Sequence, residues 1–368
     1  MQPAFSAADH DCMARALRLA ERGLLTTTPN PRVGCVVVRD GQVVGEGWHV
    51  RAGGQHAEVH ALRAAGDRAR GATAFVTLEP CSHHGRTPPC AETLLAAGVQ
   101  RVVAAIEDPN PLVAGRGLAT LRQAGVRAEC GLLADEAREL NIGFVARMTR
   151  ARPWLRLKLA ASLDGKTALL NGASQWLTGA AARQDGHRWR ARACAILTGI
   201  GTVRDDDPQL NVRDVAAPPG ELRQPLRIVV DSHLELSPDA RVLRGGGTLV
   251  AAVVADAARS EALAQRGAEV LLLPGSDGRV DLEALLAELA RRGVNEVHAE
   301  AGFVLSGALL QAGLVDELLL YLAPCLVGDA ARGMFALPQL ASLADRKPLL
   351  IRDLRVIGQD LRLLARFA

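Results

Sequence analysis

Strand and helix signals alternate along this chain of 368 residues from one end to the other. Short apolar runs are separated by amphipathic stretches and by glycine-bearing turns. This alternation is typical of α/β layers. A chain of this length should hold two domains, at ~150 residues per domain. Because the pattern restarts near residue 150, we expect domains at 1–150 and 151–368.

Composition narrows the class of partner. The apolar fraction of 49% is ordinary for a globular protein. A net charge of +3 gives no strong case for binding nucleic acid or an anionic membrane. Aromatic residues make up 3% of the chain, which leaves little material for stacking on bases. We therefore expect a small-molecule substrate, with no nucleic acid and no membrane as partner.

The N-terminal stretch has early acidic residues and predicts an amphipathic helix rather than a signal peptide. No later stretch approaches the ~18 apolar residues that a membrane span needs. We expect a cytoplasmic protein, where thiols stay reduced and a cysteine pair favours metal binding or catalysis over a disulfide.

The elements of the first domain can be placed from local signals. Ser6 can cap a first helix, and Asp40-Gly41 predicts a hairpin turn within residues 33–49. A helix should begin near His56. A buried strand at 72–80, a helix at 89–98, a strand at 99–108 and one more helix-strand pair ending near Cys130 should follow.

In the second domain, apolar runs predict a further series of strands. They are expected at 154–165, 193–199, 226–232, 248–254, 268–274, 295–302 and 316–324. The stretch 216–225 carries three prolines and a glycine and is expected to be a surface loop.

Four residues of the first domain suggest a metal centre. Catalytic zinc takes three protein ligands and leaves a fourth position for water, and His56, Cys81 and Cys90 offer one nitrogen and two thiolates. Glu58 could carry protons without binding the metal. H-x-E followed by P-C-x-x-C is the pattern of zinc-dependent base deaminases, but here eight residues, not two, separate the cysteines.

The remaining cysteines have a simpler interpretation. A lone cysteine is usually a small buried hydrophobe, and this is expected for Cys12, Cys35, Cys130, Cys194 and Cys325. His60 lies four residues after His56 on the same helical face. We expect it to have a structural role or to contact the metal ligands without binding the metal itself.

The stretches PNPRVGCVVV, HAEVHAL, TLEPCSHHGRTPPC and DPNP together resemble the deaminase half of the bifunctional riboflavin-biosynthesis deaminase-reductases, in which the loop between the cysteines is expanded. The resemblance implies a cytidine-deaminase-like three-layer domain, Zn²⁺ held by His56, Cys81 and Cys90, and Glu58 as the catalytic acid-base. Its substrate would be a pyrimidine ribotide, 2,5-diamino-6-(5-phosphoribosylamino)pyrimidin-4-one. The implied substrate contacts are Asn30, His49, His83, Arg86, Asp108 and Asn110. Surface solvation of His49 and His84 stays open as the alternative.

The second domain has no G-x-G-x-x-G after a strand, because Arg204 breaks the one candidate, so a Rossmann domain is not supported. Residues 298–313, HAEAGFVLSGALLQAG, read as a strand turning into a helix whose first amides could bind phosphate.

KLAASLDGKTA, SQWLTG, TGIGTVRDDDPQLNVR, IVVDS and EAGFVLSGALLQAGLVDEL resemble the reductase half of the same family. The resemblance implies a dihydrofolate-reductase-like fold and NADPH-dependent reduction of the ribosyl group to a ribityl chain. The implied NADPH contacts are Ala160, Trp176, Thr202, Asp206, Ser232, Gly302, Phe303, Val304, Leu305, Ser306, Gly307 and Ala308. The implied substrate contacts are Ser174, Arg190, Leu210, Arg213 and Glu300.

Some of these positions could serve the fold instead of a ligand. Many family members have proline where this chain has Phe303. Ser174 and Trp176 could serve in a turn and in packing, and the acidic run at 205–207 could be a helix end. Lys158 is a further candidate for catalysis or substrate binding, because an unpaired lysine inside a strand would be costly.

Three hypotheses for the whole chain remain. The first is the bifunctional deaminase-reductase, for which the resemblance also implies a homo-oligomer. The second is a nucleic-acid base deaminase with a recognition domain, which should carry a basic, aromatic-bearing surface. The third is a binding scaffold with a closed structural zinc site, in which His83 or His84 would supply the fourth ligand.

Overall fold

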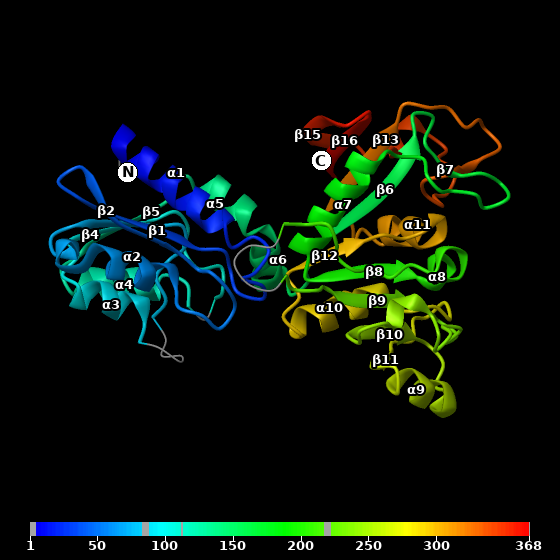
Figure 1. Ribbon diagram of the computed structural model, residues 1–368, viewed down its shortest axis with the longest axis horizontal. Helices are drawn as coiled ribbons and strands as arrows, with labels where there is room; N and C mark the ends of the chain where they lie inside the picture. The colour runs from blue at the N-terminus through cyan, green and yellow to red at the C-terminus, as the bar shows by residue number, and fades with distance from the viewer. Residues whose placement is uncertain (1–4, 83–87, 112, 217–221, 368) are drawn as a thin grey trace. The chain divides into compact units, whose positions relative to one another are not determined.

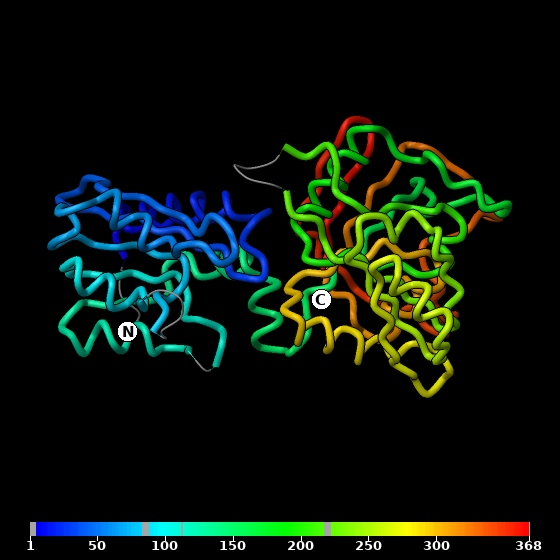
Figure 2. The backbone as a smooth tube through the Cα atoms, turned by 60° about the horizontal axis from the view of Figure 1, so that its bottom comes forward, coloured from blue at the N-terminus to red at the C-terminus, as the bar shows by residue number. Residues whose placement is uncertain are grey.

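The computed structural model describes residues 5–82, 88–111, 113–216 and 222–367. The chain divides after Ala151 into two compact units (Figure 1). In Figure 2 the trace runs from blue to green through the first unit and from green to red through the second. Among the described residues, every helix is too short or too polar to span a membrane.

The first unit contains a five-stranded sheet in the order β2-β1-β3-β4-β5, with β3, β4 and β5 parallel and β1 antiparallel to both of its neighbours. Its elements are α1 (Ala7–Glu21), β1 (Gly34–Arg39), β2 (Gln42–Trp48), α2 (Ala57–Ala65), β3 (Thr73–Val76), α3 (Cys90–Ala96), β4 (Arg101–Ala104), α4 (Arg116–Gln123), β5 (Arg127–Cys130), α5 (Ala134–Leu140) and α6 (Ile142–Arg150).

Helices cover both faces of this sheet and make three layers. Alternate residues of β1 point to opposite faces, so Cys35 and Val37 pack beneath α2, α3 and α4, whereas Val36 packs beneath α1 and α5. Both cores consist of fully buried apolar side chains. This arrangement confirms the three-layer deaminase-like fold.

The second unit contains a nine-stranded sheet in the order β11-β10-β9-β8-β12-β6-β13-β16-β15. Strands from β11 to β13 in that order are parallel, and β16 and β15 add an antiparallel hairpin at one edge. Its elements are β6 (Trp154–Ser162), β7 (Lys166–Ala168), α7 (Ala180–Arg192), β8 (Ala195–Gly199), α8 (Ile200–Asp206), β9 (Leu226–Val230), β10 (Thr248–Ala252), α9 (Ala257–Ala264), β11 (Ala268–Leu272), α10 (Leu282–Arg291), β12 (Glu296–Ala299), α11 (Phe303–Gln311), β13 (Glu317–Ala323), β14 (Arg332–Gly333), β15 (Leu349–Ile357) and β16 (Asp360–Phe367).

The two faces of the second sheet are buried differently. One face packs its leucines and valines against apolar residues that include those of α10 and α11. On the face beside α7, charged side chains are buried in pairs: Arg156 donates to Glu317 at 2.5 Å and lies 3.4 Å from Glu296. Buried charges need such partners, because an unpaired one would carry a large desolvation cost.

Most expected elements are confirmed. Ser6 caps α1 with a reciprocal capping box, the turn of the first hairpin falls at Asp40-Gly41, and His56 is the N-cap of α2. Each of the seven predicted strands of the second unit contains an observed strand. Pro89 is the N-cap of α3 rather than part of its first turn. Half of the expected surface loop at 216–225, residues 217–221, lies outside the described residues.

Helices α5 and α6 and the hairpin β15/β16 were not expected from the sequence. In β15 the apolar residues do not alternate with polar ones, and most of the strand is exposed. A pattern search for a half-buried strand therefore misses it.

Replacing Arg156 with methionine should destabilise the second unit by about 3–5 kcal/mol, because Glu317 and Glu296 would lose a buried partner. The free energy can be measured from urea unfolding followed by circular dichroism. Arg204→Met is the matched control, since the pair of Arg204 with Glu235 is exposed and its loss should cost less than about 1 kcal/mol. Equal losses in the two variants would contradict this prediction.

Candidate active sites

In the first unit, three metal-ligating side chains come from three different segments. His56 precedes α2, Cys81 follows β3, and Cys90 is the first residue of α3. Helices α2 and α3 pack on the same face of the sheet (Figure 1). The donor atoms of His56, Cys81 and Cys90 all lie within 4.8 Å of one another, and among the described residues they form the group suited to a metal ion.

The donors already contact one another. His56 Nδ1 lies 3.2 Å from Cys90 Sγ and 3.6 Å from Cys81 Sγ, and the amide of Cys90 donates to Cys81 Sγ at 3.3 Å. The contact with the Cys90 side chain lowers the pKa of the Cys81 thiol to about 4, and the same contact raises the pKa of the Cys90 thiol. One imidazole nitrogen and two thiols at this spacing fit tetrahedral zinc with one open position.

Glu58 lies in the first turn of α2, and 3% of its surface is exposed. It is not a member of the three-donor group. Burial raises the pKa of its carboxyl, so the group is suited to accept and return a proton.

Asn30 and His49 lie beside the donors. The His49 ring meets the His56 ring edge-on with centroids 5.6 Å apart. His49 Nε2 is 3.1 Å from the side-chain Nδ2 of Asn30, and its Nδ1 is 3.0 Å from the Gln55 carbonyl oxygen. His49 is buried, so the alternative that it is a solvated surface residue is wrong.

Two further expected substrate contacts of this unit, Asp108 and Asn110, follow β4. The amide of Asn110 donates to the Asp108 carboxylate at 2.9 Å, which joins the two residues in one turn. His83, Arg86 and His84 lie outside the described residues.

The cysteines outside the donor group are mostly covered. Cys35 and Cys194 are buried, and Cys12 and Cys130 are half-buried. Cys325 is exposed, so its interpretation as a buried hydrophobe is wrong. It follows the end of β13, where the chain leaves the sheet.

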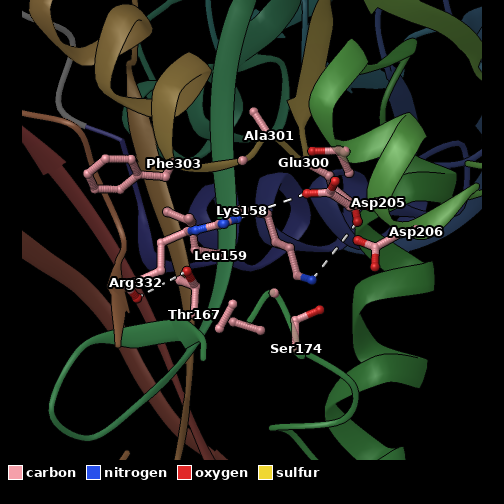
Figure 3. A pocket seen from close by; sticks show the side chains of 15 residues that line it. Lys158, Leu159, Thr167, Ser174, Asp205, Asp206, Glu300, Ala301, Phe303 and Arg332 are labelled. Carbon is pink, nitrogen blue, oxygen red and sulfur yellow. Dashed lines mark hydrogen bonds and ion pairs between the residues drawn. The ribbon is translucent and has the colours of Figure 1, made fainter. Parts of the chain in front are cut away.

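In the second unit, residues of β6 and of the segments that follow β8 and β12 line a cavity of about 200 Å³ (Figure 3). Its lining residues come from β6, β7, α8, β14, the loop at 172–174 and the segment 300–303 at the start of α11. The lining residues are Lys158, Leu159, Ala160, Thr167, Ala168, Gly172, Ser174, Thr202, Asp205, Asp206, Glu300, Ala301, Gly302, Phe303 and Arg332.

A half-buried charge cluster lies at one side of this cavity. Glu300 binds Arg190 through both carboxylate oxygens, and its Oε2 lies 4.0 Å from Lys158 Nζ. Figure 3 shows Lys158 pointing toward Glu300 from β6. Burial alone would raise the pKa of Glu300, but Arg190 more than offsets this and holds the pKa well below its usual value. Burial lowers the pKa of Lys158, which suits it to proton transfer.

The turn between β12 and α11 is open toward the cavity. Gly302 is the N-cap of α11, and a Cβ added there would lie 3.3 Å from Thr202 Oγ1. The first amides of the helix have no side-chain cap, so this turn fits a phosphate of NADPH.

Several expected contacts lie away from the cavity. Ser306 is buried and its hydroxyl donates to the Ala301 carbonyl, and Gly307 packs against the Ala336 backbone. Both residues therefore support the turn before α11 and do not line the cavity. Leu210 is buried and Arg213 is exposed. Trp176 is 68% exposed beside Arg183, which does not support its alternative role in packing. Ser232, Val304, Leu305 and Ala308 also do not line the cavity.

The acidic run lies at a helix end, which was one of its two expected roles. Helix α8 ends at Asp206, and Asp205 and Asp206 also line the cavity. A helix end and a cavity wall are therefore compatible.

Sequence reasoning did not single out His298 and Arg332 near this site, and it gave Asp205 only as part of a helix end. His298 is fully buried with its Nε2 3.3 Å from Glu300 Oε1, and Arg332 and Asp205 face each other at 4.0 Å across the cavity. The alternation of Glu296, His298 and Glu300 along β12 was the available signal, since residues two apart share a face.

Comparisons with known proteins agree with these two sites. Residues 6–106 match the cytidine and deoxycytidylate deaminase zinc-binding region, and residues 153–362 match the RibD C-terminal domain. The riboflavin biosynthesis protein RibD of Escherichia coli strain K12 is 51% identical over 360 residues, which cover 96% of this chain and 97% of that protein.

Solved structures agree as well. The structure of Acinetobacter baumannii RibD, form 1, is 44% identical with a TM-score of 0.92 and covers 98% of this chain and 99% of that one. A Thermotoga maritima enzyme is 31% identical with a TM-score of 0.85 and the same coverage. It is described as a diaminohydroxyphosphoribosylaminopyrimidine deaminase/5-amino-6-(5-phosphoribosylamino)uracil reductase.

The fold and the two sites define a zinc-dependent deaminase joined in one chain to an NADPH-dependent reductase. The chain belongs to the RibD family of bifunctional riboflavin-biosynthesis enzymes. The first of the three hypotheses is therefore confirmed, in place of a nucleic-acid deaminase or a binding scaffold.

Proposed function

We propose that the first unit hydrolyses the ring amino group of 2,5-diamino-6-(5-phosphoribosylamino)pyrimidin-4-one, with zinc held by His56, Cys81 and Cys90 and Glu58 as the catalytic acid-base. The convergence of the three donors around one point, with the buried Glu58 beside them, carries this proposal. Asn30, His49, Asp108 and Asn110 would bind the substrate, together with His83 and Arg86.

When bound, zinc acidifies water at neutral pH. The Glu58 carboxylate accepts the proton that this water loses as its oxygen bonds to the ring carbon. Glu58 passes that proton to the ring nitrogen that gained the displaced electron pair, and then carries the remaining hydroxyl proton to the amino group, which leaves as ammonia while the ring carbon becomes a carbonyl. Burial favours the protonated form that this second transfer needs.

Glu58→Gln should lower the rate of ammonia release by at least a factor of about 10²–10⁴, because the amide cannot carry the proton. Zinc content, measured by elemental analysis, should stay at the wild-type level. Reduction of the separately supplied deaminated intermediate by NADPH should also be unchanged, which shows that the chain is folded.

A pair of cysteine variants tests the metal assignment in the same assay. Cys81→Ala should lose zinc and ammonia release together, whereas Cys35→Ala, which removes a buried thiol outside the donor group, should keep its zinc. Ammonia release that survives in Glu58→Gln would exclude the proposed mechanism.

We propose that the second unit reduces the ribosyl group of the deaminated product to a ribityl chain. NADPH supplies the hydride. Lys158 Nζ is suited to donate the accompanying proton to the sugar ring oxygen, and Glu300 holds Lys158 and Arg190 in place. Arg190 and Arg213 are the natural partners of the substrate phosphate, because a guanidinium binds phosphate through two hydrogen bonds.

The remaining contacts complete this site. Ser174 and Leu210 would touch the substrate. Ala160, Trp176, Thr202, Asp206, Ser232 and the run from Gly302 to Ala308 would touch NADPH.

Glu300→Gln should lower kcat/KM for NADPH oxidation on the order of 100-fold, because the carboxylate that orients Lys158 and Arg190 loses its charge. The absorbance of NADPH follows the reaction. Glu235→Gln changes an exposed carboxylate of the same unit and should leave the rate unchanged. A Glu300→Gln enzyme with wild-type kcat/KM would contradict the assigned role.

We propose further that the protein forms a homo-oligomer in the cytoplasm, where the thiols of the metal site stay reduced. The edge strand β15 pairs only with β16 among the described strands and exposes Leu350, Ile351, Leu354 and Val356. An exposed apolar edge strand promotes aggregation unless another element covers it. The β15 strand of a second copy would cover it in a dimer with two-fold symmetry.

Ile351→Lys should shift the protein toward the monomer mass in light scattering coupled to size exclusion, because a charge would be buried at the contact. Leu326→Lys, at another exposed leucine of the second unit, should leave the mass unchanged. A monomeric wild-type protein would rule out this proposal.

A further inference from the structure

Glu79 is a buried acidic residue with no role in the chemistry proposed above. It lies two residues before Cys81, and 4% of its surface is exposed. A carboxylate in such a place is costly unless donors surround it. The identity of its donors therefore indicates what the residue does.

Three backbone amides donate to the Glu79 carboxylate. Oε2 accepts from the amide of Asp108 at 3.0 Å and from that of Gly115 at 2.8 Å, and Oε1 accepts from the amide of Leu118 at 3.1 Å. Gly115 is the N-cap of α4 and has no side chain to cap it, and Leu118 lies in the first turn. Glu79 thus supplies the negative charge and the acceptors that this helix start lacks.

Gly117 also contributes to the contact between α4 and the segment that precedes Cys81. A Cβ at Gly117 would lie 1.9 Å from the carbonyl oxygen of Pro80, so the first turn of α4 rests directly on the peptide that precedes Cys81. The amide of Glu79 also donates to the Ile106 carbonyl at 2.9 Å. The chain just before one proposed zinc ligand is therefore joined at several points to the segment after β4.

That segment carries Asp108 and Asn110. The amide of Asp108 is held by Glu79, and the Asp108 carboxylate in turn holds the amide of Asn110. Without the Glu79 carboxylate, the hydrogen bond that holds the amide of Asp108 would be lost. The backbone that carries the Asp108 and Asn110 side chains would then no longer be fixed by this contact. Their distance from the metal site depends on that backbone.

We infer that Glu79 is a positioning residue for substrate binding by the deaminase unit: its carboxylate holds Asp108 and Asn110 at a fixed place relative to Cys81. The inference rests on the proposed role of Asp108 and Asn110 as substrate contacts. Glu79 itself touches neither the metal donors nor the reacting atoms in this scheme.

Glu79→Gln tests this directly. The amide keeps the size of the side chain but replaces one acceptor oxygen with an NH₂ group, so at least one backbone amide loses its acceptor. The KM for the pyrimidine ribotide in ammonia release should rise at least about tenfold, while kcat changes much less. Zinc content and NADPH-dependent reduction of the deaminated intermediate should stay at wild-type values.

Asp9→Asn is the matched control for a purely structural role. Asp9 is a buried carboxylate of the same unit that caps α1 and pairs with Arg101. Both variants should lower the melting temperature, but only Glu79→Gln should raise KM. If the two variants have the same KM, the inference is overturned.

Two further variants separate the positioning role of Glu79 from the substrate contact of Asp108. Gly117→Ala displaces the same segment with the carboxylate intact and should also raise KM, which covers the case that Glu79→Gln does not fold. Asp108→Ala tests the substrate contact itself. If KM rises for Asp108→Ala but keeps its wild-type value in Glu79→Gln and Gly117→Ala, only the positioning role of Glu79 is overturned. If KM is unchanged in Asp108→Ala, the proposed substrate contact of Asp108 is overturned.

Discussion

Both sites depend on one constraint of parallel sheets, namely that the carboxyl ends of neighbouring strands meet at the same edge. In the first unit Cys81 follows β3, and Asp108 follows the neighbouring strand β4. In the second unit Glu300 follows β12, while α8 follows the neighbouring strand β8. Residues far apart in the chain are brought together without long loops, because the hydrogen bonds of the sheet fix the register.

Buried charge is the second theme of the molecule. Glu79 and Arg156 are buried and Glu300 is half-buried, and each is paired in a different way: with backbone amides, with two carboxylates, and with a guanidinium and an ammonium. Such groups fix geometry more reliably than they add stability, because desolvation offsets much of the attraction. This agrees with the position of Glu79 two residues before Cys81 and of Glu300 at the wall of the cavity.

Local sequence signals predicted the elements well. The capping box at Ser6, the turn at Asp40-Gly41 and the helix start at His56 follow from contacts between residues a few positions apart. The same local logic failed for β15, whose exposed leucines follow no strand alternation, and for Cys325, whose exposure depends on where the chain leaves the sheet. These features are decided by packing across the fold.

The sequence by itself determined the two α/β domains, the family and the donor types of the zinc site, because residue types, their order and short-range spacing are written in it. Only the tertiary structure decided that His49 is buried beside His56, that His298 lies against Glu300, and that Glu79 caps a helix that begins far along the chain. Each of these is a contact between distant segments. Such contacts exist only once strand order and helix packing have brought those segments together.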